Sequence, residues 1–477
     1  MKIPKNGMSK EKIFNQLESF RTNDLDWRSG RAFGYIFDPG PEVLGISKEA
    51  YSLFLTENGL DFTAFPSLLR LENELVDMAR KHLHGDEQVV GNFTSGGTES
   101  IILAVKTARD YFRAKRPEIK EPEMILPTTG HAAFHKAAHY LQVKVVQTPV
   151  DPITFKADVK AVRDAITHNT ILLVGSAPSY AHGVVDPIRA LGELALEKGI
   201  LLHSDACMGG FMLPYFRRLG APVPDFDFSV PGVSSLSVDL HKYAYAAKGA
   251  SLILYRNKDL RKYQIFACSR WAGYTVVNNA VQSSKSGGPM AAAWAVINFI
   301  GDDGYLEFAR RKLEATRRVV EGIEKIPELR LLGRPEMCLV AFTSDMVNVF
   351  HLIDDMNDKG WYIQPALSFD NSQQHIHMSI NVSNVKWIDK FLSDLEDSVH
   401  QVLNRKAEEL PAGLQQALTS LDPSAMTGEV FSRMLQMAGI NGTELPRKMA
   451  DINEILNMLS PELRERLLVE YVNNLFC

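Results

Sequence analysis

The chain has 477 residues, of which 45% are hydrophobic and 23% are charged, and this composition is typical of a large globular protein with more than one domain. A net charge of −5 gives no reason to expect a nucleic acid partner. Residues 1–20 are interrupted by charges and lack the apolar core of a signal peptide, and no stretch approaches the roughly 18 apolar residues of a membrane span. We therefore expect a cytoplasmic protein with no transmembrane segment.

The four cysteines stand far apart in the sequence. They are Cys207, Cys268, Cys338 and Cys477, and no two of them have the CxxC spacing. This pattern predicts free thiols in a reducing compartment and argues against a disulfide framework or a zinc site. We expect no bound metal.

Short apolar runs alternate with helical patterns from about residue 85 to 256. The runs are rich in Val, Ile and Leu and occupy residues 89–93, 124–127, 143–148, 170–175, 200–206, 234–240 and 250–255. Uniformly apolar runs of this length are typical of strands that are buried on both faces of a largely parallel sheet. Between them, residues 186–198 begin with Asp-Pro and end before Gly199, as a capped helix does. Together these patterns predict an α/β fold with a mostly parallel, seven-stranded sheet.

The pattern of predicted helices and strands changes after Gly301. Residues 291–301 predict a buried helix, and the chain then predicts a helix (305–326), two strands (329–334 and 337–343), a helix (347–359) and a strand (375–380). We expect an N-terminal segment (1–65), a large α/β domain (66–300), a smaller α+β domain (301–403) and a helical C-terminal extension (404–477). In the extension, residues 452–476 are apolar-rich and are expected to pack on their own or a partner subunit.

A glycine pair joins the first predicted strand to a helix in the sequence GNFTSGGTES, residues 91–100. Gly96 and Gly97 allow the backbone to approach a ligand closely. The amides around Gly97 and Thr98 would then favour an anion at the helix N-terminus. A plain strand-to-helix turn with Thr98 as the N-cap is the alternative. The sequence is neither a P-loop, because no Gly-Lys-Ser/Thr follows, nor a dinucleotide fingerprint.

Two charged residues follow buried strands further along the chain. Asp205 ends the run ILLHSDA, where it could cap a helix or serve as counter-ion to a positively charged ligand atom. Lys242, in the stretch LSVDLHKYAYAAKG, ends another run. If Lys242 is desolvated and its pKa is depressed, it can act as a nucleophile toward aldehydes. The alternative is that Lys242 is a solvated charge on the surface.

An anion cradle, a buried carboxylate and a nucleophilic lysine are together what pyridoxal 5′-phosphate (PLP) requires. Its phosphate needs helix-start amides, its pyridinium nitrogen needs a carboxylate, and its aldehyde needs a lysine for a Schiff base. His131 follows another strand end and could stack its ring on the cofactor, and His241 beside Lys242 fits a hydrogen bond to the phosphate or cofactor. For both histidines the alternative is a polar loop residue.

Several ordered motifs resemble the group II PLP-dependent decarboxylase family. They are TSGGTES, HAAFHKAA, HSDACMGGF and HKYAYAAKG, within a resemblance that covers roughly residues 25–400 and is greatest for the sphingosine-1-phosphate lyases. The resemblance implies a type I, aspartate aminotransferase-like fold and a homodimer whose active site lies at the subunit interface.

The resemblance also implies roles for individual residues. It implies Lys242 as the Schiff-base lysine, Asp205 on the pyridine nitrogen and His131 stacked on the ring. Gly96, Gly97, Thr98 and His241 are implied near the phosphate, and Lys248 as an auxiliary acid or base. The segment 283–288, which ends in Gly288, resembles a loop that reaches the cofactor phosphate of the neighbouring subunit.

Four positions depart from the lyase pattern. The lyases have tyrosine, histidine, tyrosine and arginine where this chain has Phe33, Asp61, Val276 and Lys285. We expect these positions to surround the substrate and not the cofactor. A substrate phosphate would also need cations, for which Arg31, Arg270 and Lys285 are candidates, with exposed surface charge as the alternative.

Three functions remain open at this point. The favoured one is retro-aldol cleavage of a phosphorylated long-chain amino alcohol to an aldehyde and phosphoethanolamine, with Lys248 as the candidate base for the β-hydroxyl. The second is an L-amino-acid decarboxylase that uses the same cofactor site. The third is a protein of this fold that has lost catalysis and serves as a binding partner. PLP directs cleavage to the bond that stands perpendicular to its ring, so the residues that hold the substrate decide between the first two.

Overall fold

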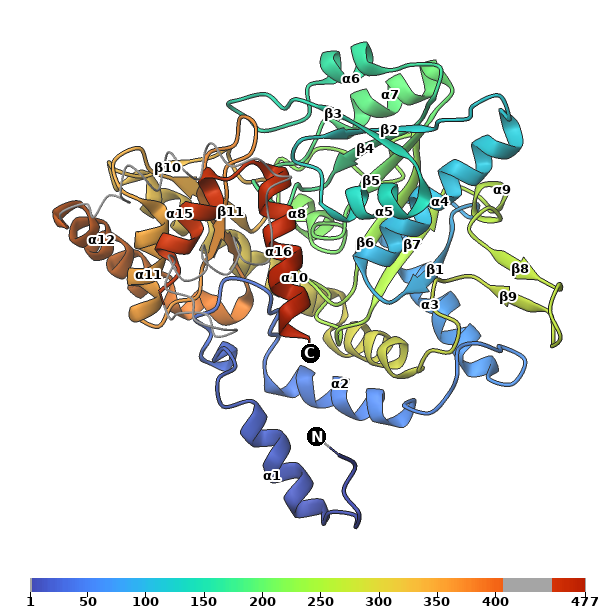
Figure 1. The fold of residues 1–477 in the computed structure, drawn as a ribbon, viewed down its shortest axis with the longest axis horizontal. Helices are drawn as coiled ribbons and strands as arrows, with labels where there is room; N and C mark the ends of the chain where they lie inside the picture. Colours follow the sequence, from blue (N-terminus) through green and yellow to red (C-terminus); the bar gives the residue numbers. More distant parts are fainter. Residues whose placement is uncertain (1, 406–447, 477) are drawn as a thin grey trace.

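The computed structural model describes residues 2–405 and 448–476 (Figure 1). A seven-stranded sheet with the order β1-β7-β6-β5-β4-β2-β3 forms the centre of the large domain. Its strands are β1 (Val90–Thr94), β2 (Glu123–Pro127), β3 (Lys144–Thr148), β4 (Thr170–Ser176), β5 (Leu201–Asp205), β6 (Val233–Asp239) and β7 (Ser251–Tyr255). Only β7 runs antiparallel to its two neighbours. The predicted mostly parallel sheet is therefore confirmed.

Helices cover both faces of this sheet, and β2, β4 and β7 are buried along their whole length. The helices are α4 (Gly97–Lys115), α5 (Ala133–Leu141), α6 (Val159–Ala165), α7 (Ile188–Lys198), α8 (Leu213–Arg218) and α9 (Lys258–Arg261). Helix α7 ends at Gly199, as predicted, but begins two residues later than expected. The reason is that buried Asp186 does not cap it: its carboxylate accepts the amides of Ala157 and Ser176 at 2.8 and 2.7 Å.

The strand directions bring the predicted site residues to one edge of the sheet. Strands β1, β5 and β6 all run the same way, because β1 and β6 are each antiparallel to β7 and β5 is parallel to β6. Their carboxyl ends carry Thr94, Asp205 and Asp239. Ligands of open α/β sheets bind at this edge.

The smaller domain holds a four-stranded antiparallel sheet with the order β10-β11-β13-β12. Its elements are β10 (Arg330–Leu331), β11 (Leu339–Thr343), α11 (Val349–Asp358), β12 (Gln364–Ala366), β13 (His375–Ser379), the 3₁₀ helix η2 (Val382–Trp387) and α12 (Ile388–Asn404). Strand β12 is absent from the sequence prediction, because three residues that include Pro365 carry no strand pattern. As an edge strand, β12 tolerates that proline.

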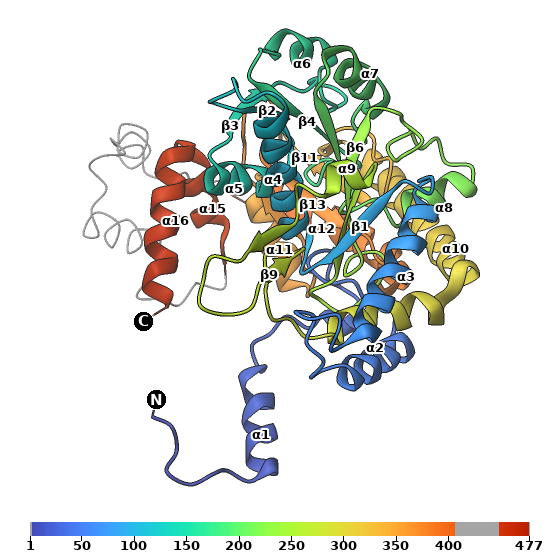
Figure 2. The same cartoon turned by 90° about the vertical axis from the view of Figure 1, so that its right-hand side faces the viewer.

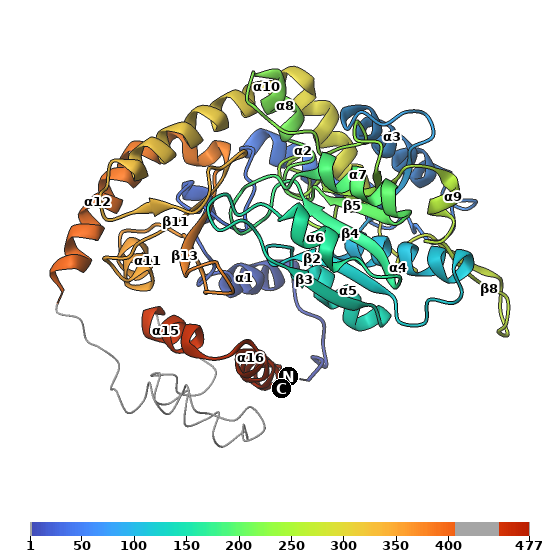
Figure 3. The same ribbon diagram turned by 90° about the horizontal axis from the view of Figure 1, so that it is seen from above.

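Helix α10 (Gly288–Glu324) joins the two domains, and Figure 3 shows it running from one to the other. The sequence predicts two helices here, and the structure has one helix with a kink at Gly301, whose φ of 65° and ψ of 173° are not helical. A residue with a side chain would be strained at this φ, whereas glycine is not. The amino-terminal part of α10 packs on α2 (Pro41–Leu53), and the remainder belongs to the small domain.

The chain before α2 is attached to the small domain. The Phe33 amide donates to the Tyr362 carbonyl at 2.9 Å, and the Ser379 amide donates to the Phe33 carbonyl at 2.6 Å. The Phe33 side chain is fully buried, and its ring centroid lies 4.8 Å from that of Phe391. The expectation that position 33 surrounds the substrate is therefore wrong, because the extended backbone turns this side chain into the core.

Two parts of the chain, helix α1 and a hairpin, project from this body (Figures 1 and 2). Helix α1 (Lys10–Phe20) buries none of its residues and is followed by the short η1 (Trp27–Ser29) and later by α3 (Pro66–His82). Strands β8 (Phe266–Cys268) and β9 (Val276–Asn278) pair as a hairpin that we call the arm, residues 266–278. The sequence analysis missed the arm, because its strands have only three residues each.

The described C-terminal helices are α15 (Ala450–Met458) and α16 (Pro461–Leu475), which agrees with the prediction for residues 452–476. Helix α15 packs on α11, where the Asp354 carboxylate accepts the amides of Met449 and Ala450, both at 3.0 Å. Residues 406–447, which include most of the predicted extension, lie outside the described residues. Across residues 2–405 and 448–476, no helix is long and apolar enough to cross a membrane.

Candidate active site

A cavity of about 350 Å³ opens at the carboxyl edge of the large sheet. It is lined by Ser95, Gly96, Gly97, Thr98, Glu99, Ile101, His131, Ser176, Pro178, Tyr180, Asp205, Cys207, Met208, Asp239, His241 and Lys242. Its volume lies within the range of small-molecule sites. The fold thus brings together most of the residues that the sequence singles out, while Lys248 and Gly288 are not among those that line it.

The first turn of α4 forms the anion end of the cavity. Its N-cap is Gly96, so the alternative with Thr98 as the cap is wrong. The amides of Gly97 and Thr98 have no acceptor within the helix and suit an anion. A Cβ on Gly97 would stand 2.8 Å from both the Asp239 Oδ2 and the Cys207 Sγ atoms. Glycine at position 97 therefore permits the close approach of this turn to Asp239.

The Glu99 carboxylate joins this turn to the base of the arm. Its Oε2 accepts the Ser95 amide at 2.6 Å, and its Oε1 accepts the Val281 amide at 2.6 Å. The side chain is buried. Glu99 thus fixes the loop before α4 against the segment that follows the arm.

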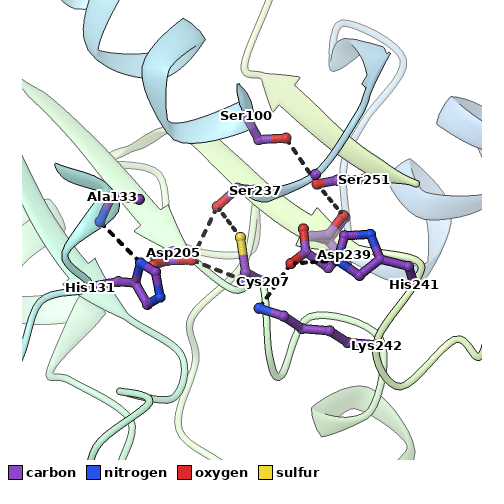
Figure 4. A network of polar contacts seen from close by, with 12 residues as sticks. Ser100, His131, Ala133, Asp205, Cys207, Ser237, Asp239, His241, Lys242 and Ser251 are labelled. Carbon is purple, nitrogen blue, oxygen red and sulfur yellow. Dashed lines mark hydrogen bonds and ion pairs between the residues drawn. The ribbon is translucent and has the colours of Figure 1, made fainter. Parts of the chain in front are cut away.

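Asp205 is held rigidly at the end of β5 (Figure 4). Its Oδ1 accepts the Cys207 amide at 3.1 Å and the Ser237 hydroxyl at 3.2 Å. Its other oxygen accepts no hydrogen bond from the described residues, although the side chain is only 7% exposed. A buried carboxylate in this position is stabilised by a cationic donor in the cavity, such as a protonated ring nitrogen.

Asp239 is the central residue that the sequence analysis missed. Its Oδ2 lies 2.9 Å from the Lys242 Nζ and 3.7 Å from the His241 Nε2 (Figure 4). The side chain is buried, and its Oδ1 has no hydrogen-bond partner among the described residues. The signal was present in the sequence, because an acidic residue ends the predicted strand three positions before the lysine.

The charge state of Lys242 differs from the sequence expectation. Burial alone lowers its pKa, but the adjacent Asp239 outweighs burial and raises the pKa above the usual value. For Asp239 the two effects have the opposite signs. Burial alone raises its pKa, but the neighbouring Lys242 and His241 outweigh burial and lower the pKa below the usual value. The expected depressed pKa is therefore wrong for the cofactor-free chain, because the sequence reasoning counted desolvation without the counter-ion. Lys242 must lose a proton before it can attack an aldehyde, and the negative charge of Asp239 opposes that loss.

Two histidines border the cavity as neutral rings. The His131 Nδ1 accepts the Ala133 amide at 3.1 Å, and burial lowers the pKa of His131. The His241 Nδ1 accepts the Ala250 amide at 3.1 Å, and burial also lowers the pKa of His241. A neutral His241 therefore carries its hydrogen on Nε2, toward Asp239. The stacking of His131 on a cofactor ring stays a prediction.

Lys248 and Gly288 lie outside the cavity lining. The Lys248 Nζ donates to the Tyr35 carbonyl at 3.0 Å and lies 4.9 Å from the centre of the Phe37 ring. Burial, followed by repulsion from Lys242, lowers the pKa of Lys248 to about 8. Gly288 begins α10, where a Cβ would stand 2.9 Å from the Tyr51 ring. Their predicted roles remain predictions.

The candidate substrate residues lie away from the cavity of their own chain. The Arg31 guanidinium stacks between Trp361 and Trp387, at 5.1 and 4.4 Å from the ring centres, so the expectation that it binds a substrate phosphate is not supported. The loops that carry Asp61 and Lys285 lie side by side, since the Gly59 amide donates to the Lys285 carbonyl at 2.8 Å. Val276 and Arg270 belong to the arm.

Sequence reasoning also missed Tyr180. This residue lines the cavity, and its hydroxyl donates to the Gln364 Oε1 at 2.8 Å. Its ring lies 4.2 Å from that of His377, on β13. The cavity wall is thus connected to the small domain at this point.

Comparison with known proteins decides the family. The pyridoxal-dependent decarboxylase conserved domain matches residues 2–345. The chain belongs to this family. Residues 412–474 match a second family, described as "Pyridoxal-dependent enzyme, C-terminal putative HTH domain". The resemblance seen in the sequence is confirmed, and pyridoxal 5′-phosphate is the cofactor of this lyase.

Named relatives fall in two functional groups. The sphingosine-1-phosphate lyase of Arabidopsis thaliana is 43% identical over 408 residues, which cover 84% of this chain and 74% of the relative. A protein of Pyrococcus furiosus named "Probable L-aspartate decarboxylase" is 34% identical over 364 residues, 76% of this chain and 95% of the relative. The structure of a Burkholderia pseudomallei sphingosine-1-phosphate lyase is 36% identical, with a TM-score of 0.81 over 84% of this chain and 93% of that one.

The residues present fit the family's cofactor. The start of α4 lines the cavity with amides that have no acceptor within the helix, and Asp205 and Asp239 each offer an oxygen with no partner among the described residues. An anion end, a carboxylate and an amine are thus present in one cavity of suitable size.

Proposed function

We propose that the protein is a carbon–carbon lyase that cleaves a phosphorylated long-chain amino alcohol to an aldehyde and phosphoethanolamine. The observation that carries the chemistry is the contact between Lys242 and Asp239 at 2.9 Å, in one cavity with Asp205 and the start of α4. The substrate class is supported by 43% identity to a sphingosine-1-phosphate lyase.

Each side chain of the cavity has a task in this proposal. Bound PLP supplies an electron sink for the bond that breaks. The amides of Gly97 and Thr98, beside Gly96 and His241, hold its phosphate, and Asp205 keeps a proton on its ring nitrogen. His131 covers the ring face. Asp239 pairs with the Lys242 ammonium and holds it in the cavity, and the amine becomes free for covalent attachment of the cofactor once that proton leaves to solvent.

Lys248 is the proposed base for the substrate's β-hydroxyl. Retro-aldol cleavage requires removal of that proton, and a base works best when its pKa lies near the working pH. The pKa of Lys248 is lowered to about 8, and the residue stands six positions after Lys242 on the same turn. A movement of its side chain away from the Tyr35 carbonyl would bring it toward the cavity.

We propose a homodimer in which the cavity of each chain is completed by its partner. Asp61, Val276 and Lys285 are all outside their own cavity lining. The Lys285 Nζ is buried without a hydrogen-bond partner among the described residues, which leaves its charge free for an anion such as a phosphate. The arm exposes Phe266, Trp271, Tyr274 and Val277, an apolar surface that a second copy would cover. In this arrangement Gly288 ends the loop that reaches the partner's cofactor phosphate.

Decarboxylation of an L-amino acid is the second candidate. It is favoured by 34% identity to the protein of Pyrococcus furiosus named as an L-aspartate decarboxylase, and the same cavity would serve it. The two reactions differ only in which bond of the substrate is held perpendicular to the cofactor ring.

A product assay on the PLP-loaded protein separates these functions. We expect release of a long-chain aldehyde from sphingosine-1-phosphate and no carbon dioxide from L-aspartate or L-glutamate. Carbon dioxide release with no aldehyde would establish the decarboxylase instead. Reduction with borohydride and peptide mapping should find the pyridoxyl group on Lys242. A protein that binds no PLP would instead be a catalytically silent binding partner.

We also propose a cytoplasmic location and no nucleic acid partner. The described cysteines, Cys207, Cys268 and Cys338, are free thiols, which suits a reducing compartment. The family name of the C-terminal segment mentions a helix-turn-helix, but residues 448–476 are acidic. They hold three cations against five carboxylates: Lys448, Arg464 and Arg466 against Asp451, Glu454, Glu462, Glu465 and Glu470. That balance disfavours binding to phosphates of nucleic acid.

A further inference from the structure

Lys312 is a buried lysine to which neither the cavity nor the proposed reaction gives a role. It lies in the part of α10 beyond Gly301, and its side chain is 0% exposed. Its Nζ has no hydrogen-bond partner among the described residues. An ammonium group buried in this way costs free energy unless other groups compensate for the lost water.

The faces of two tyrosines provide that compensation. The Lys312 Nζ lies 4.5 Å from the centre of the Tyr243 ring and 5.3 Å from that of Tyr245. Both distances are within the range of cation–π attraction, which is strongest where water is excluded. Burial lowers the pKa of Lys312 to about 8, with nearby Cys338 acting in the opposite direction, so the group is mostly charged at neutral pH.

These tyrosines belong to the turn that carries Lys242. Tyr243 is the next residue in the chain, and Tyr245 follows two positions later with a left-handed φ of 62°. A tyrosine at this φ is strained and needs contacts that hold it in place. The turn therefore depends on what packs behind it.

The small domain supplies further contacts to the same turn. The Tyr243 hydroxyl donates to the Ile380 carbonyl at 3.3 Å, just after β13. The Tyr305 hydroxyl, also on α10, donates to the Ala244 carbonyl at 2.8 Å. Lys312 and these two bonds thus all contact the turn from residues beyond Gly301.

We propose that Lys312 is a positioning residue, whose ammonium holds the rings of Tyr243 and Tyr245 and so fixes the orientation of Lys242 in the cavity. It thereby couples the placement of the small domain to the cofactor attachment point. This inference rests on the proposed function, because it takes Lys242 as the residue to which the cofactor is attached.

A purely structural role predicts a different outcome from a positioning role. Methionine has a length similar to that of lysine and would fill the same space without the cost of burying a charge. If Lys312 served stability alone, Lys312→Met would be neutral or stabilising and would leave the cofactor unaffected. If Lys312 positions the turn, the variant keeps its stability but holds the cofactor less rigidly.

The test uses the full-length, PLP-loaded protein and its Lys312→Met variant. Lys325→Met, which removes an exposed lysine just beyond the end of α10, is the matched control. Three quantities are compared: the melting temperature, the amount of bound PLP, and the visible circular dichroism per bound PLP, which reports how asymmetrically the ring is held. For Lys312→Met we expect an equal or higher melting temperature and at least a twofold loss of this dichroism. Lys325→Met should match the wild type, and Lys312→Arg, which keeps the cation, should recover more than half of the lost signal.

The outcomes separate this inference from the proposed function. Wild-type dichroism per bound PLP in Lys312→Met would overturn the positioning role. The positioning role would also be overturned if Lys312→Met has a lower melting temperature and binds less PLP, while the dichroism per bound PLP is unchanged. That result would indicate a loss of packing. If Lys312→Arg does not fold, the comparison of Lys312→Met with the control decides alone. Failure to find the pyridoxyl group on Lys242 of the wild type would instead overturn the proposed function, and the inference with it.

Discussion

The cofactor end of the cavity and the loops that differ from the lyases are built in opposite ways. Asp205 and Asp239 end strands of one chain and Lys242 lies on the turn that follows Asp239, and hydrogen bonds or ion pairs fix each of them. Asp61, Val276 and Lys285 lie on loops and on the arm, away from their own cavity. The difference indicates that residues of one chain hold the cofactor. In the proposed dimer, the residues that select the substrate would lie at the interface between the two copies.

Removal of the attachment point should have the largest effect. In Lys242→Ala the cofactor would have no amine to bond to, and we expect kcat to fall at least about 1,000-fold. Borohydride reduction should leave no pyridoxyl group on the variant. A variant that retains more than about a tenth of wild-type activity would show that the chemistry is centred elsewhere.

Asp239→Asn tests the residue that sequence reasoning missed. The amide keeps the shape of the side chain but carries no charge to stabilise the Lys242 ammonium, so the pKa of Lys242 should fall and cofactor attachment should become about 10-fold faster. The rise of the visible absorption band after PLP is added to the apo protein measures this rate. Asp345→Asn, at an exposed surface site, is the control. Equal rates in the two variants would remove Asp239 from the mechanism.

Lys248 should set the rising, acid limb of the pH profile. A base works in its unprotonated form, so activity should increase as the pH rises through the pKa of about 8. Lys248→Met should lower kcat by about 30-fold and abolish this rise. Measurement of kcat from pH 6 to 10 checks both effects, and an unchanged limb in the variant would assign it to another group.

Complementation between two defective chains tests whether the cavity is shared. Lys285→Ala should raise KM about tenfold without affecting attachment to Lys242. Co-expression of Lys285→Ala with Lys242→Ala would create mixed dimers with one intact site. With substrate far below KM, where Lys285→Ala alone is about tenfold less active, we expect about a quarter of wild-type activity from random pairing. Activity no greater than that of the mixed separate variants would place Lys285 in the cavity of its own chain, or outside the site altogether.

The smallest effect concerns stability in acid and involves two buried histidines, His182 and His377. Burial lowers the pKa of His182 and His377 to about 3, below the 6.5 of an unfolded chain. Between these values the unfolded state binds more protons, so stability falls as the pH drops below 6.5. His377→Gln should reduce the difference between urea midpoints at about pH 7 and pH 4.5. An undiminished difference would show that His377 does not contribute.

The strands of the large sheet could be predicted because they are buried on both faces, and burial leaves a plain apolar run in the sequence. Strand β12 and the arm leave no such run, since they are short and partly exposed. Gly301 was predicted to separate two helices, but the sequence could not tell a break from a kink that glycine tolerates within one helix. The local sequence pattern thus predicts individual helices and strands better than it predicts how consecutive elements are connected.

The site residues could be predicted by type, but their charge states and neighbours could not. The motif around Lys242 includes Asp239, yet only the fold shows that the two side chains meet at 2.9 Å and that the lysine's pKa rises. Phe33 was placed at the substrate because the motif was read by alignment, whereas its side-chain direction depends on its pairing with Tyr362 and Ser379. Arg31 is a cation in the sequence but a stacking partner of two tryptophans in the fold.

The carboxylate of Glu99 has a consequence for assembly. It is shared by an amide of the phosphate-binding loop and an amide at the root of the projecting hairpin. A displacement at either end is therefore transmitted to the other through a single rigid side chain. If a second copy covers the arm as proposed, cofactor binding at the start of α4 and pairing of the two copies would both act on this one carboxylate.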